Sequence, residues 1–155
     1  MRIGHGYDAH RFADNRKCII CGVDVPYEKG LLGHSDADVP VHALMDALLG
    51  AAAMGDIGKM FPDTDEKWKD ADSVEMLKAV NDAIRKRGYT FVNCDITIIA
   101  QKPKLKPHIE KMRENVARAL GTDIGNVSVK ATTEEGMGFT GNLEGICAHA
   151  VCIIE

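Results

Sequence analysis

Two short clusters of aspartate and histidine carry the side chains best suited to hold a metal ion. Asp8 and His10 are two residues apart, and in an extended segment this spacing directs both side chains to one face. His42 can add a third ligand from a separate element. Two imidazoles and one carboxylate leave a tetrahedral zinc ion with one open position, which is typical of a catalytic zinc site. The spacing alone leaves open an alternative, in which both histidines are satisfied by backbone groups.

The residues just before His42 carry groups that suit a phosphate. His34 and Ser35 directly precede the helix expected to hold His42, so an imidazole and a hydroxyl lie near a helix N-terminus. The N-terminal end of a helix favours anions. Ser35 could equally cap that helix. Asp56 lies in the glycine-rich loop after that helix and could accept hydrogen bonds from sugar hydroxyls. A turn without function is the commoner meaning of such a loop.

Groups that suit phosphates also follow the ends of two expected strands. The segment 131–136 contains adjacent threonines, whose hydroxyls can donate to phosphate oxygens, followed by carboxylates that could hold Mg²⁺ or Mn²⁺. The segment 100–106 contains three lysines. Because ligands favour the carboxyl ends of parallel strands, these two ends together indicate a nucleotide-type substrate.

The composition is that of an ordinary globular protein. The 155 residues are 45% hydrophobic and 27% charged, enough for one domain with a real core. No apolar run approaches the roughly 20 residues that a membrane span needs. The first residues lack the apolar core of a signal peptide, so we expect a cytoplasmic protein that does not bind membranes. The net charge of −4 argues weakly against nucleic acid as a partner.

The charge is unevenly distributed along the chain. Residues 31–75 hold ten acids and three lysines, whereas residues 101–118 hold six bases and two acids. A metal site in the acidic part and an anion contact in the basic part would account for this, but so would solvated surface. The five cysteines are an odd number, which argues against a disulfide framework. Cys18 and Cys21 have the spacing of a zinc or redox motif, yet in a β-like segment they face opposite ways, so we expect buried thiols.

The pattern of apolar residues predicts an α+β fold. Asp38 and Asp72 are expected to cap helices, and the strand–helix–strand unit in the middle predicts two parallel strands joined by a right-handed crossover. We therefore expect a single mixed β-sheet with three helices on one face, in the manner of a ferredoxin-like sandwich. The expected strands cover 1–7, 18–25, 91–100, 126–132 and 145–154, the expected helices cover 39–54, 73–87 and 107–121, and a long polar loop covers 55–71.

The last expected strand, 145–154, is apolar on both faces. Such a strand needs cover on both sides, whereas the three helices cover only one. A second subunit on the other face would supply that cover. The alternative is a short C-terminal strand whose outward apolar residues are incidental.

Several long runs resemble the 2-C-methyl-D-erythritol 2,4-cyclodiphosphate synthase family of the non-mevalonate route to isoprenoid precursors. The resemblance covers essentially the whole chain, which implies one domain over 1–155. The runs that carry it are 2–10, 27–35, 46–58, 61–65, 130–133 and 138–141.

This resemblance implies a phosphorus–oxygen lyase. Its substrate would be 4-diphosphocytidyl-2-C-methyl-D-erythritol 2-phosphate, whose 2-phosphate attacks the β-phosphate and releases CMP. The family is a homotrimer whose sheets face the three-fold axis and whose active sites lie between subunits. Two alternatives make different predictions: a zinc-dependent phosphohydrolase would give hydrolysis products, and a non-catalytic nucleotide-binding trimer would have a closed, structural metal site.

The resemblance also assigns roles to individual residues. It implies that Asp8, His10 and His42 bind zinc or another divalent transition metal and that Glu135 binds Mg²⁺ or Mn²⁺. It makes His34 and Thr133 the catalytic residues that steady the transition state. The substrate contacts that it implies are Asp8, His10, His34, Ser35, Asp56, Ile57, Gly58, Phe61, Pro62, Asp63, Thr64, Asp65, Ala100, Gln101, Lys102, Pro103, Lys104, Leu105, Lys106, Ala131, Thr132, Thr133, Glu134, Glu135, Phe139 and Asn142.

Two residues depart from the family pattern. Asn142 stands where many relatives have an arginine that contacts an isoprenoid diphosphate in a central cavity, so the resemblance does not carry that ligand over to this chain. Glu134 replaces a frequent threonine. An extra carboxylate beside the phosphates would either weaken substrate binding or strengthen cation binding.

Overall fold

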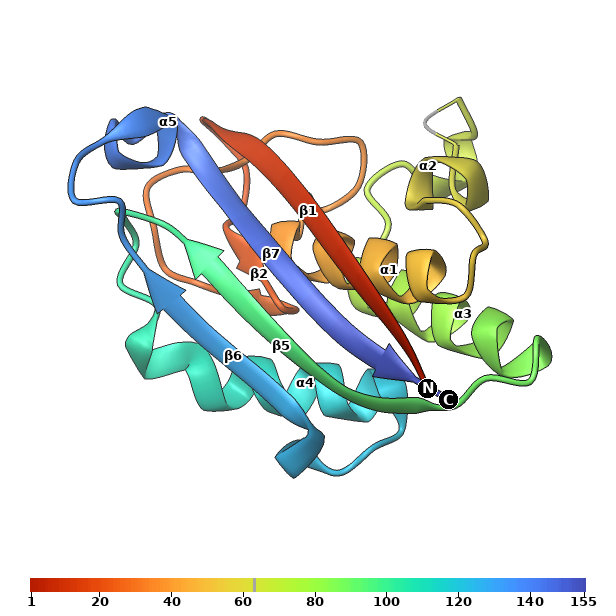
Figure 1. Cartoon of the computed structure of the whole chain (residues 1–155). Coiled ribbons are helices and arrows are strands. Elements are labelled where there is room, and N and C mark those ends of the chain that lie inside the picture. The colour runs from red at the N-terminus through yellow and green to blue at the C-terminus, as the bar shows by residue number, and fades with distance from the viewer. Residues whose placement is uncertain (63) are drawn as a thin grey trace.

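The computed structural model describes residues 1–62 and 64–155, and a mixed five-stranded sheet runs through it (Figure 1). The strand order is β4-β1-β7-β5-β6. β1 and β5 each pair with β7 in antiparallel fashion, and β5 pairs with β6 in parallel. The strands are β1 (Arg2–Ala13), β4 (Gly30–Leu31), β5 (Phe91–Ile99), β6 (Val127–Thr132) and β7 (Gly145–Ile154).

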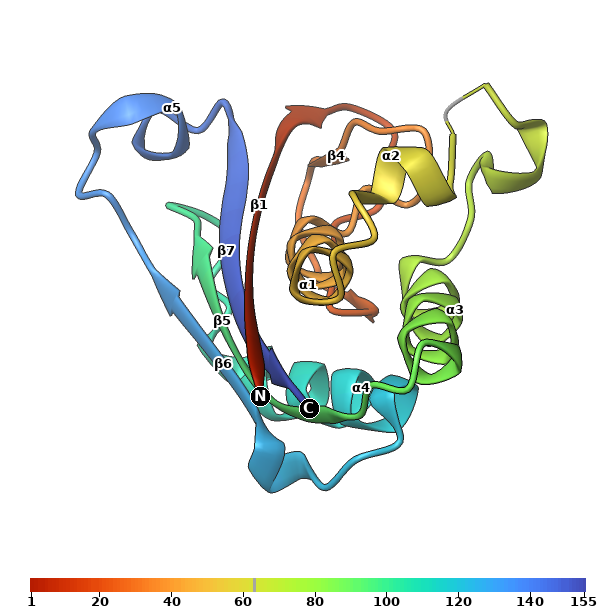
Figure 2. The ribbon, with the colours of Figure 1, turned by 45° about the vertical axis from the view of Figure 1, so that its right-hand side comes forward.

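The three predicted long helices are present, and all lie on one side of the sheet (Figure 2). α1 packs on β1 and β7, α4 packs on β6, and α3 packs on α1 and α4. The long helices are α1 (Val39–Ala51), α3 (Ser73–Lys86) and α4 (Ile109–Leu120). The short helical elements are α2 (Ile57–Met60), α5 (Gly138–Gly141), η1 (Glu66–Trp68), η2 (Lys106–His108) and η3 (Ile124–Asn126).

The α1 helix begins where the sequence predicts, because the Asp38 side chain caps it. That carboxylate accepts hydrogen bonds from Val41 N at 3.4 Å and from the backbone amides of Cys21 and Gly22 at 2.8 and 2.6 Å. It therefore ties the start of α1 to a hairpin earlier in the chain. Burial raises the pKa of Asp38 to about 7.

Two glycines of β1 allow α1 to lie directly on the strand. A Cβ atom at Gly4 would lie 1.8 Å from the carbonyl oxygen of Ala47, and one at Gly6 would lie 1.9 Å from that of Ala43. Only a residue without a side chain permits this approach. The close packing of β1 and α1 brings the ligand-bearing ends of the two elements together.

Four predictions about the fold need correction. The first strand extends beyond residue 7 to Ala13, because its pairing with β7 continues to Arg11. The segment 18–25 is a hairpin of β2 (Ile19–Ile20) and β3 (Val23–Asp24), because Cys21 and Gly22 adopt positive φ and turn the chain. The loop 55–71 contains α2 and η1, each capped by an aspartate.

The fourth correction concerns the ferredoxin-like arrangement. That arrangement follows the order β-α-β-β-α-β, and another strand splits the two parallel strands of each β-α-β unit. Here β5, α4 and β6 follow one another, and β5 and β6 are neighbours in parallel. The predicted mixed sheet is confirmed, but its connectivity is different.

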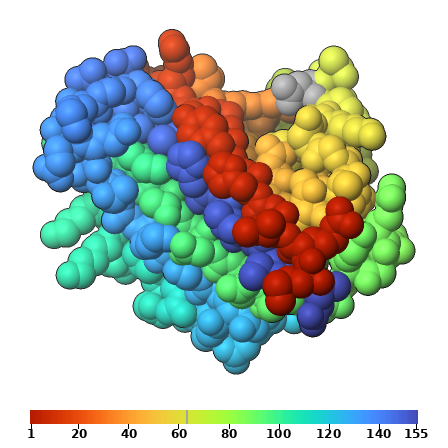
Figure 3. Space-filling view, in the orientation of Figure 1, coloured from red at the N-terminus to blue at the C-terminus, as the bar shows by residue number. Residues whose placement is uncertain are grey.

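The two faces of the sheet differ in their cover. Along β7, the inward residues Ile146, Ala148 and Ala150 are completely buried beneath the helices. On the outer face, Val151 of β7 remains 36% exposed and Ile3 of β1 remains 72% exposed. Figure 3 shows β1, β7 and β5 lying open at this surface, and no element among residues 1–62 and 64–155 crosses it. The sheet therefore presents a partly apolar outer face.

All five cysteines are buried and free, as predicted for Cys18 and Cys21. Burial raises the pKa of the Cys18 thiol to about 12, which keeps it protonated at neutral pH. No helix in the described part of the chain is long and apolar enough to cross a membrane. The cytoplasmic location stays a prediction.

Candidate active site

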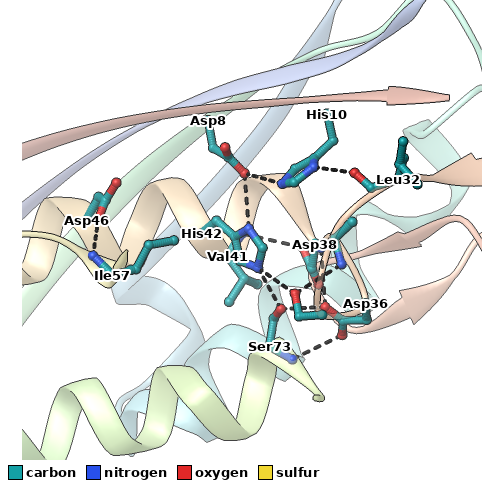
Figure 4. Close-up of polar contacts among 12 residues, drawn as sticks. Asp8, His10, Leu32, Asp36, Asp38, Val41, His42, Asp46, Ile57 and Ser73 are labelled. Atoms are coloured by element: carbon teal, nitrogen blue, oxygen red, sulfur yellow. Dashed lines mark hydrogen bonds and ion pairs between the residues drawn. The ribbon is translucent and has the colours of Figure 1, made fainter. Parts of the chain in front are cut away.

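The structure brings the three predicted metal ligands together at the contact between β1 and α1 (Figure 4). Asp8 and His10 lie on β1, and His42 lies on α1. Asp8 Oδ2 is 3.1 Å from His10 Nε2 and 3.1 Å from His42 Nδ1. The ligand atoms all lie within 4.8 Å of one another. This donor set of one carboxylate and two imidazoles fits a divalent transition metal.

The orientation of His10 is fixed by the backbone. Its Nδ1–H donates to the carbonyl oxygen of Leu32 at 2.6 Å. With Nδ1 so engaged, Nε2 is the nitrogen that faces Asp8: it donates to the carboxylate when it carries a proton and can bind a metal when it does not. This arrangement, in which the second ring nitrogen of a ligand histidine holds a backbone carbonyl, is common around protein metal ions.

His42 is oriented by two serines. Its Nε2 lies 2.9 Å from Ser73 Oγ and 3.2 Å from Ser35 Oγ. The Ser73 hydroxyl donates its only proton to Asp36 Oδ1, and Ser73 N donates to Asp36 Oδ2 at 3.0 Å. The oxygen of Ser73 is thus left as an acceptor, so His42 donates to it from Nε2. Nδ1 is therefore the nitrogen of His42 that faces Asp8: it donates to the carboxylate when it carries a proton and can bind a metal when it does not.

The two imidazoles determine the charge state of Asp8. Burial by itself would raise the pKa of this carboxyl, but hydrogen bonds with His10 and His42 hold the pKa of Asp8 well below its usual range. The carboxylate is consequently ionised at neutral pH, as a metal ligand must be.

A cavity of about 350 Å³ opens beside the three ligands. His34 lines it, and its Nε2 is buried with no hydrogen-bond partner among the described residues. A buried ring nitrogen without a partner is available to a ligand. The residues that line the cavity are Asp8, His10, Gly33, His34, Ser35, His42, Ile57, Gly58, Phe61, Trp68 and Met76.

Ser35 combines the two functions that the sequence left as alternatives. Its Oγ accepts from Ala37 N at 3.2 Å, which stabilises the turn before α1, and it also contacts His42. The segment 31–35 is held by Arg16, which donates to Leu31 O at 2.8 Å and to Ser35 O at 2.6 Å. Sequence reasoning missed Arg16, Asp36 and the contact of Ser73, since all three act through backbone or side-chain groups distant in the sequence.

The predicted contacts of the segment 56–65 fall partly on this cavity. Asp56 caps α2 by accepting from Lys59 N at 2.9 Å, and Asp65 caps η1 by accepting from Lys67 N at 3.0 Å. Phe61 is buried against Trp68 and forms part of the wall. Pro62 and Thr64 are exposed, and Asp63 lies outside the described residues.

The ends of β5 and β6 form a second cavity of about 720 Å³. Their parallel pairing brings the segments 100–106 and 131–133 together, as the sequence predicts. Tyr27 and Ile109 complete the lining, and Lys102, Lys104 and Lys106 supply positive charge. None of these residues lines the cavity beside Asp8 and His42.

Beyond β6, Thr133 and Glu135 lie together at the surface. Thr133 Oγ1 donates to Glu135 Oε1 at 2.8 Å, so a hydroxyl and a carboxylate face one another. Glu134 instead accepts a hydrogen bond from Thr140 of α5. Its carboxylate therefore contacts α5, and both alternatives for its effect on substrate or cation binding stay predictions. Phe139 lies on α5, and Asn142 ends it; both are exposed.

The fold and this site define a mixed α+β protein with a group of three residues that could hold a metal ion beside a cavity. The chain belongs to the YgbB family, whose model matches residues 1–155.

Relatives and solved structures agree with this family. The chain is 64% identical, over 99% of its length and 98% of the relative's, to 2-C-methyl-D-erythritol 2,4-cyclodiphosphate synthase of Trichlorobacter lovleyi. It is similar to a solved cyclodiphosphate synthase in its CDP-bound form, with 33% identity, 99% and 100% coverage and a TM-score of 0.91. It also matches the bifunctional IspDF from Campylobacter jejuni, with 44% identity and a TM-score of 0.95, over 99% of this chain and 42% of that one.

Proposed function

We propose that this chain converts 4-diphosphocytidyl-2-C-methyl-D-erythritol 2-phosphate into 2-C-methyl-D-erythritol 2,4-cyclodiphosphate and CMP, as one domain over 1–155. The observation that carries the proposal is the open Asp8–His10–His42 group beside His34, in a chain 64% identical to a relative with this name. In the reaction an oxygen of the 2-phosphate forms a bond to the β-phosphorus. The bond from the β-phosphorus to its bridging oxygen breaks, and CMP leaves with that oxygen.

The chemistry needs no nucleophile from the protein, because the attacking phosphate is already an anion. The work of the site is to position two phosphates for in-line displacement and to offset their charge. Asp8, His10 and His42 would hold zinc or another divalent transition metal, which supplies Lewis-acid stabilisation of the phosphate charge when bound. Glu135 would hold Mg²⁺ or Mn²⁺ between the phosphates, with Thr133 beside it.

His34 and Thr133 are the proposed catalytic residues. The unpartnered Nε2 of His34 reaches the cavity beside the metal ligands, where a hydrogen bond to a phosphoryl oxygen would satisfy it. The hydroxyl of Thr133 is exposed at the end of β6 and donates to Glu135. With Glu135 turned to a cation, the same proton would be free for an oxygen of the diphosphate. Ser35 would lie beside the substrate, and Asp56, Gly58 and the segment 61–65 would contact its hydroxyls.

We further propose that the active site forms between subunits of a homotrimer. The cavity at 100–106 and 131–133 would take the cytidine and diphosphate, yet it shares no lining residue with the cavity beside the metal ligands. A neighbouring copy could bring its cytidine cavity against this chain's metal centre. The open outer face of the sheet, with Ile3 and Val151 exposed, would then face the three-fold axis.

The proposal is tested by incubating the metal-loaded protein with the diphosphocytidyl substrate and following the reaction by phosphorus NMR. We expect the signals of the cyclic diphosphate together with CMP. Linear hydrolysis products would indicate a zinc-dependent phosphohydrolase instead, and no conversion would contradict the proposal. Sedimentation velocity should give a particle of three 16.9-kDa chains, and a monomer would contradict the shared active site.

A further inference from the structure

A pair of histidines lies on the outer face of the sheet, away from the candidate active site. His5 is on β1 and His149 is on β7, and both are exposed. The register pairs His5 with Val151 and Tyr7 with His149, so the two histidines are diagonal neighbours across the ladder. His5 Nε2 lies 3.1 Å from His149 Nδ1. The proposed catalytic chemistry uses neither residue.

The geometry points to a second transition-metal site, held by His5 and His149. A tetrahedral ion with bonds of about 2.0–2.1 Å to imidazole nitrogens holds two of these nitrogens roughly 3.3 Å apart. The observed separation of 3.1 Å is close to that value, so a small rotation of the rings would admit an ion. Imidazole pairs suit zinc, nickel and copper rather than magnesium or calcium.

The proton balance of the pair allows this exchange when both rings are neutral. In the metal-free pair, one histidine donates an N–H to the lone pair of the other. Metal binding needs lone pairs on both His5 Nε2 and His149 Nδ1, with the protons on His5 Nδ1 and His149 Nε2. Each neutral imidazole carries one proton in either case. The ion therefore replaces a shared hydrogen bond through a change of tautomer, without releasing a proton.

The rings are already confined by their neighbours. The ring of Tyr7 lies 4.9 Å from that of His149, and the rings of His5 and His149 are 5.3 Å apart with a tilt of 30°. The exposed Val151 flanks the pair on β7. Confinement of this kind lowers the entropy lost when an ion is bound.

The pair is separate from the Asp8–His10–His42 group, although both use β1. Side chains alternate along a strand, so His5 and Tyr7 face outward whereas Asp8 and His10 face α1. Both sites can therefore be filled at once. Only the stoichiometry rests on the proposed trimer: three pairs that gather around an axis could each bind one ion or share a single ion.

Equilibrium dialysis against zinc, followed by metal analysis, tests this site. We expect the full-length protein to bind one more zinc ion, per chain or per trimer, than either His149→Gln or His5→Gln. His108→Gln is the matched control, because His108 lies on η2 away from the pair, and it should bind as much zinc as the unaltered protein. Equal zinc content in the unaltered protein and in both pair variants would overturn the proposal.

Two further measurements separate the possible causes of a lost ion. Both pair variants should retain the turnover of the unaltered protein, since neither residue touches the candidate active site. A loss of the extra ion together with loss of the folded circular dichroism spectrum would count against the site. The zinc count does not depend on turnover, so failure of the cyclisation assay would leave this inference standing, and the reverse also holds.

Discussion

Ser73 Oγ lies 2.9 Å from His42 Nε2, and the same hydroxyl donates its proton to Asp36. A residue at the start of α3 thereby determines which nitrogen of a histidine on α1 can bind a metal. We predict that Ser73→Ala lowers zinc affinity by about 10–100-fold, the usual effect of removing the partner of a ligand histidine. Competition with a chromophoric chelator measures this change.

The matched control for Ser73 is Ser128→Ala, an exposed serine on β6 far from the metal ligands. It should leave zinc affinity unchanged. Asp36→Asn should also weaken zinc binding, as Ser73→Ala does. The asparagine side chain has one accepting oxygen in place of two, so it no longer accepts from both Ser73 N and Ser73 Oγ and no longer fixes the Ser73 hydroxyl as an acceptor for His42. If both variants bind zinc like the unaltered protein, the contact does not orient His42.

Removal of a metal ligand should separate activity from folding. We predict that His42→Ala abolishes turnover, because the two remaining ligands no longer hold the metal. The protein should keep its fold and its proposed trimeric state, since its large buried core does not depend on this side chain. Turnover by phosphorus NMR, thermal unfolding and sedimentation velocity measure these outcomes. Dissociation or unfolding of the variant would show that the metal is structural.

Glu135 should determine the need for the second cation. We predict that Glu135→Ala raises the Mg²⁺ or Mn²⁺ concentration that gives half-maximal turnover, because the carboxylate opposite Thr133 is lost. Glu144→Gln, at another exposed glutamate, is the control and should not change it. An unchanged magnesium dependence of Glu135→Ala would remove this residue from the cation site.

The close packing of β1 and α1 should be essential for stability and for the metal centre. Gly4→Ala places a methyl group 1.8 Å from Ala47 O, so α1 must move away from the strand. We predict that the free energy of unfolding falls by ~1–3 kcal/mol and that the protein binds zinc more weakly. Chemical denaturation and chelator competition measure the two effects.

Gly50→Ala is the matched control for Gly4→Ala. Gly50 lies within α1, and a Cβ atom there has no neighbour within 4 Å. Alanine favours a helix over glycine, so we expect this variant to gain about 0.5–1 kcal/mol. A Gly4→Ala variant as stable as the unaltered protein would mean that α1 and β1 do not need this contact.

Much of the fold could be predicted from local patterns in the sequence. The first residues of α1 and α3 follow from the capping residues Asp38 and Asp72, and β7 has the predicted bounds because its run of apolar residues is nearly continuous. The hairpin at Ile19–Asp24 was missed because its turn uses Cys21 at positive φ, a conformation that this residue type rarely adopts.

The site divides in the same way. Asp8 and His10 could be paired from their spacing, and His42 could be added as a third donor, because residue types and strand geometry suffice for that inference. Their orientation could not be predicted. The contact of His10 with Leu32 O needs β4 to pair with β1. The contacts of Ser73 with His42 and Asp36 exist only after α3 packs against α1.

X-ray absorption at the zinc edge of the loaded protein tests the metal centre most directly. We predict two imidazole nitrogens and one carboxylate oxygen from Asp8, His10 and His42, with the remaining position held by a group that does not come from the protein. This shell should disappear in His42→Ala, whose two remaining ligands no longer hold the ion. A fourth protein ligand in the unaltered protein, or a shell that His42→Ala leaves intact, would contradict the account.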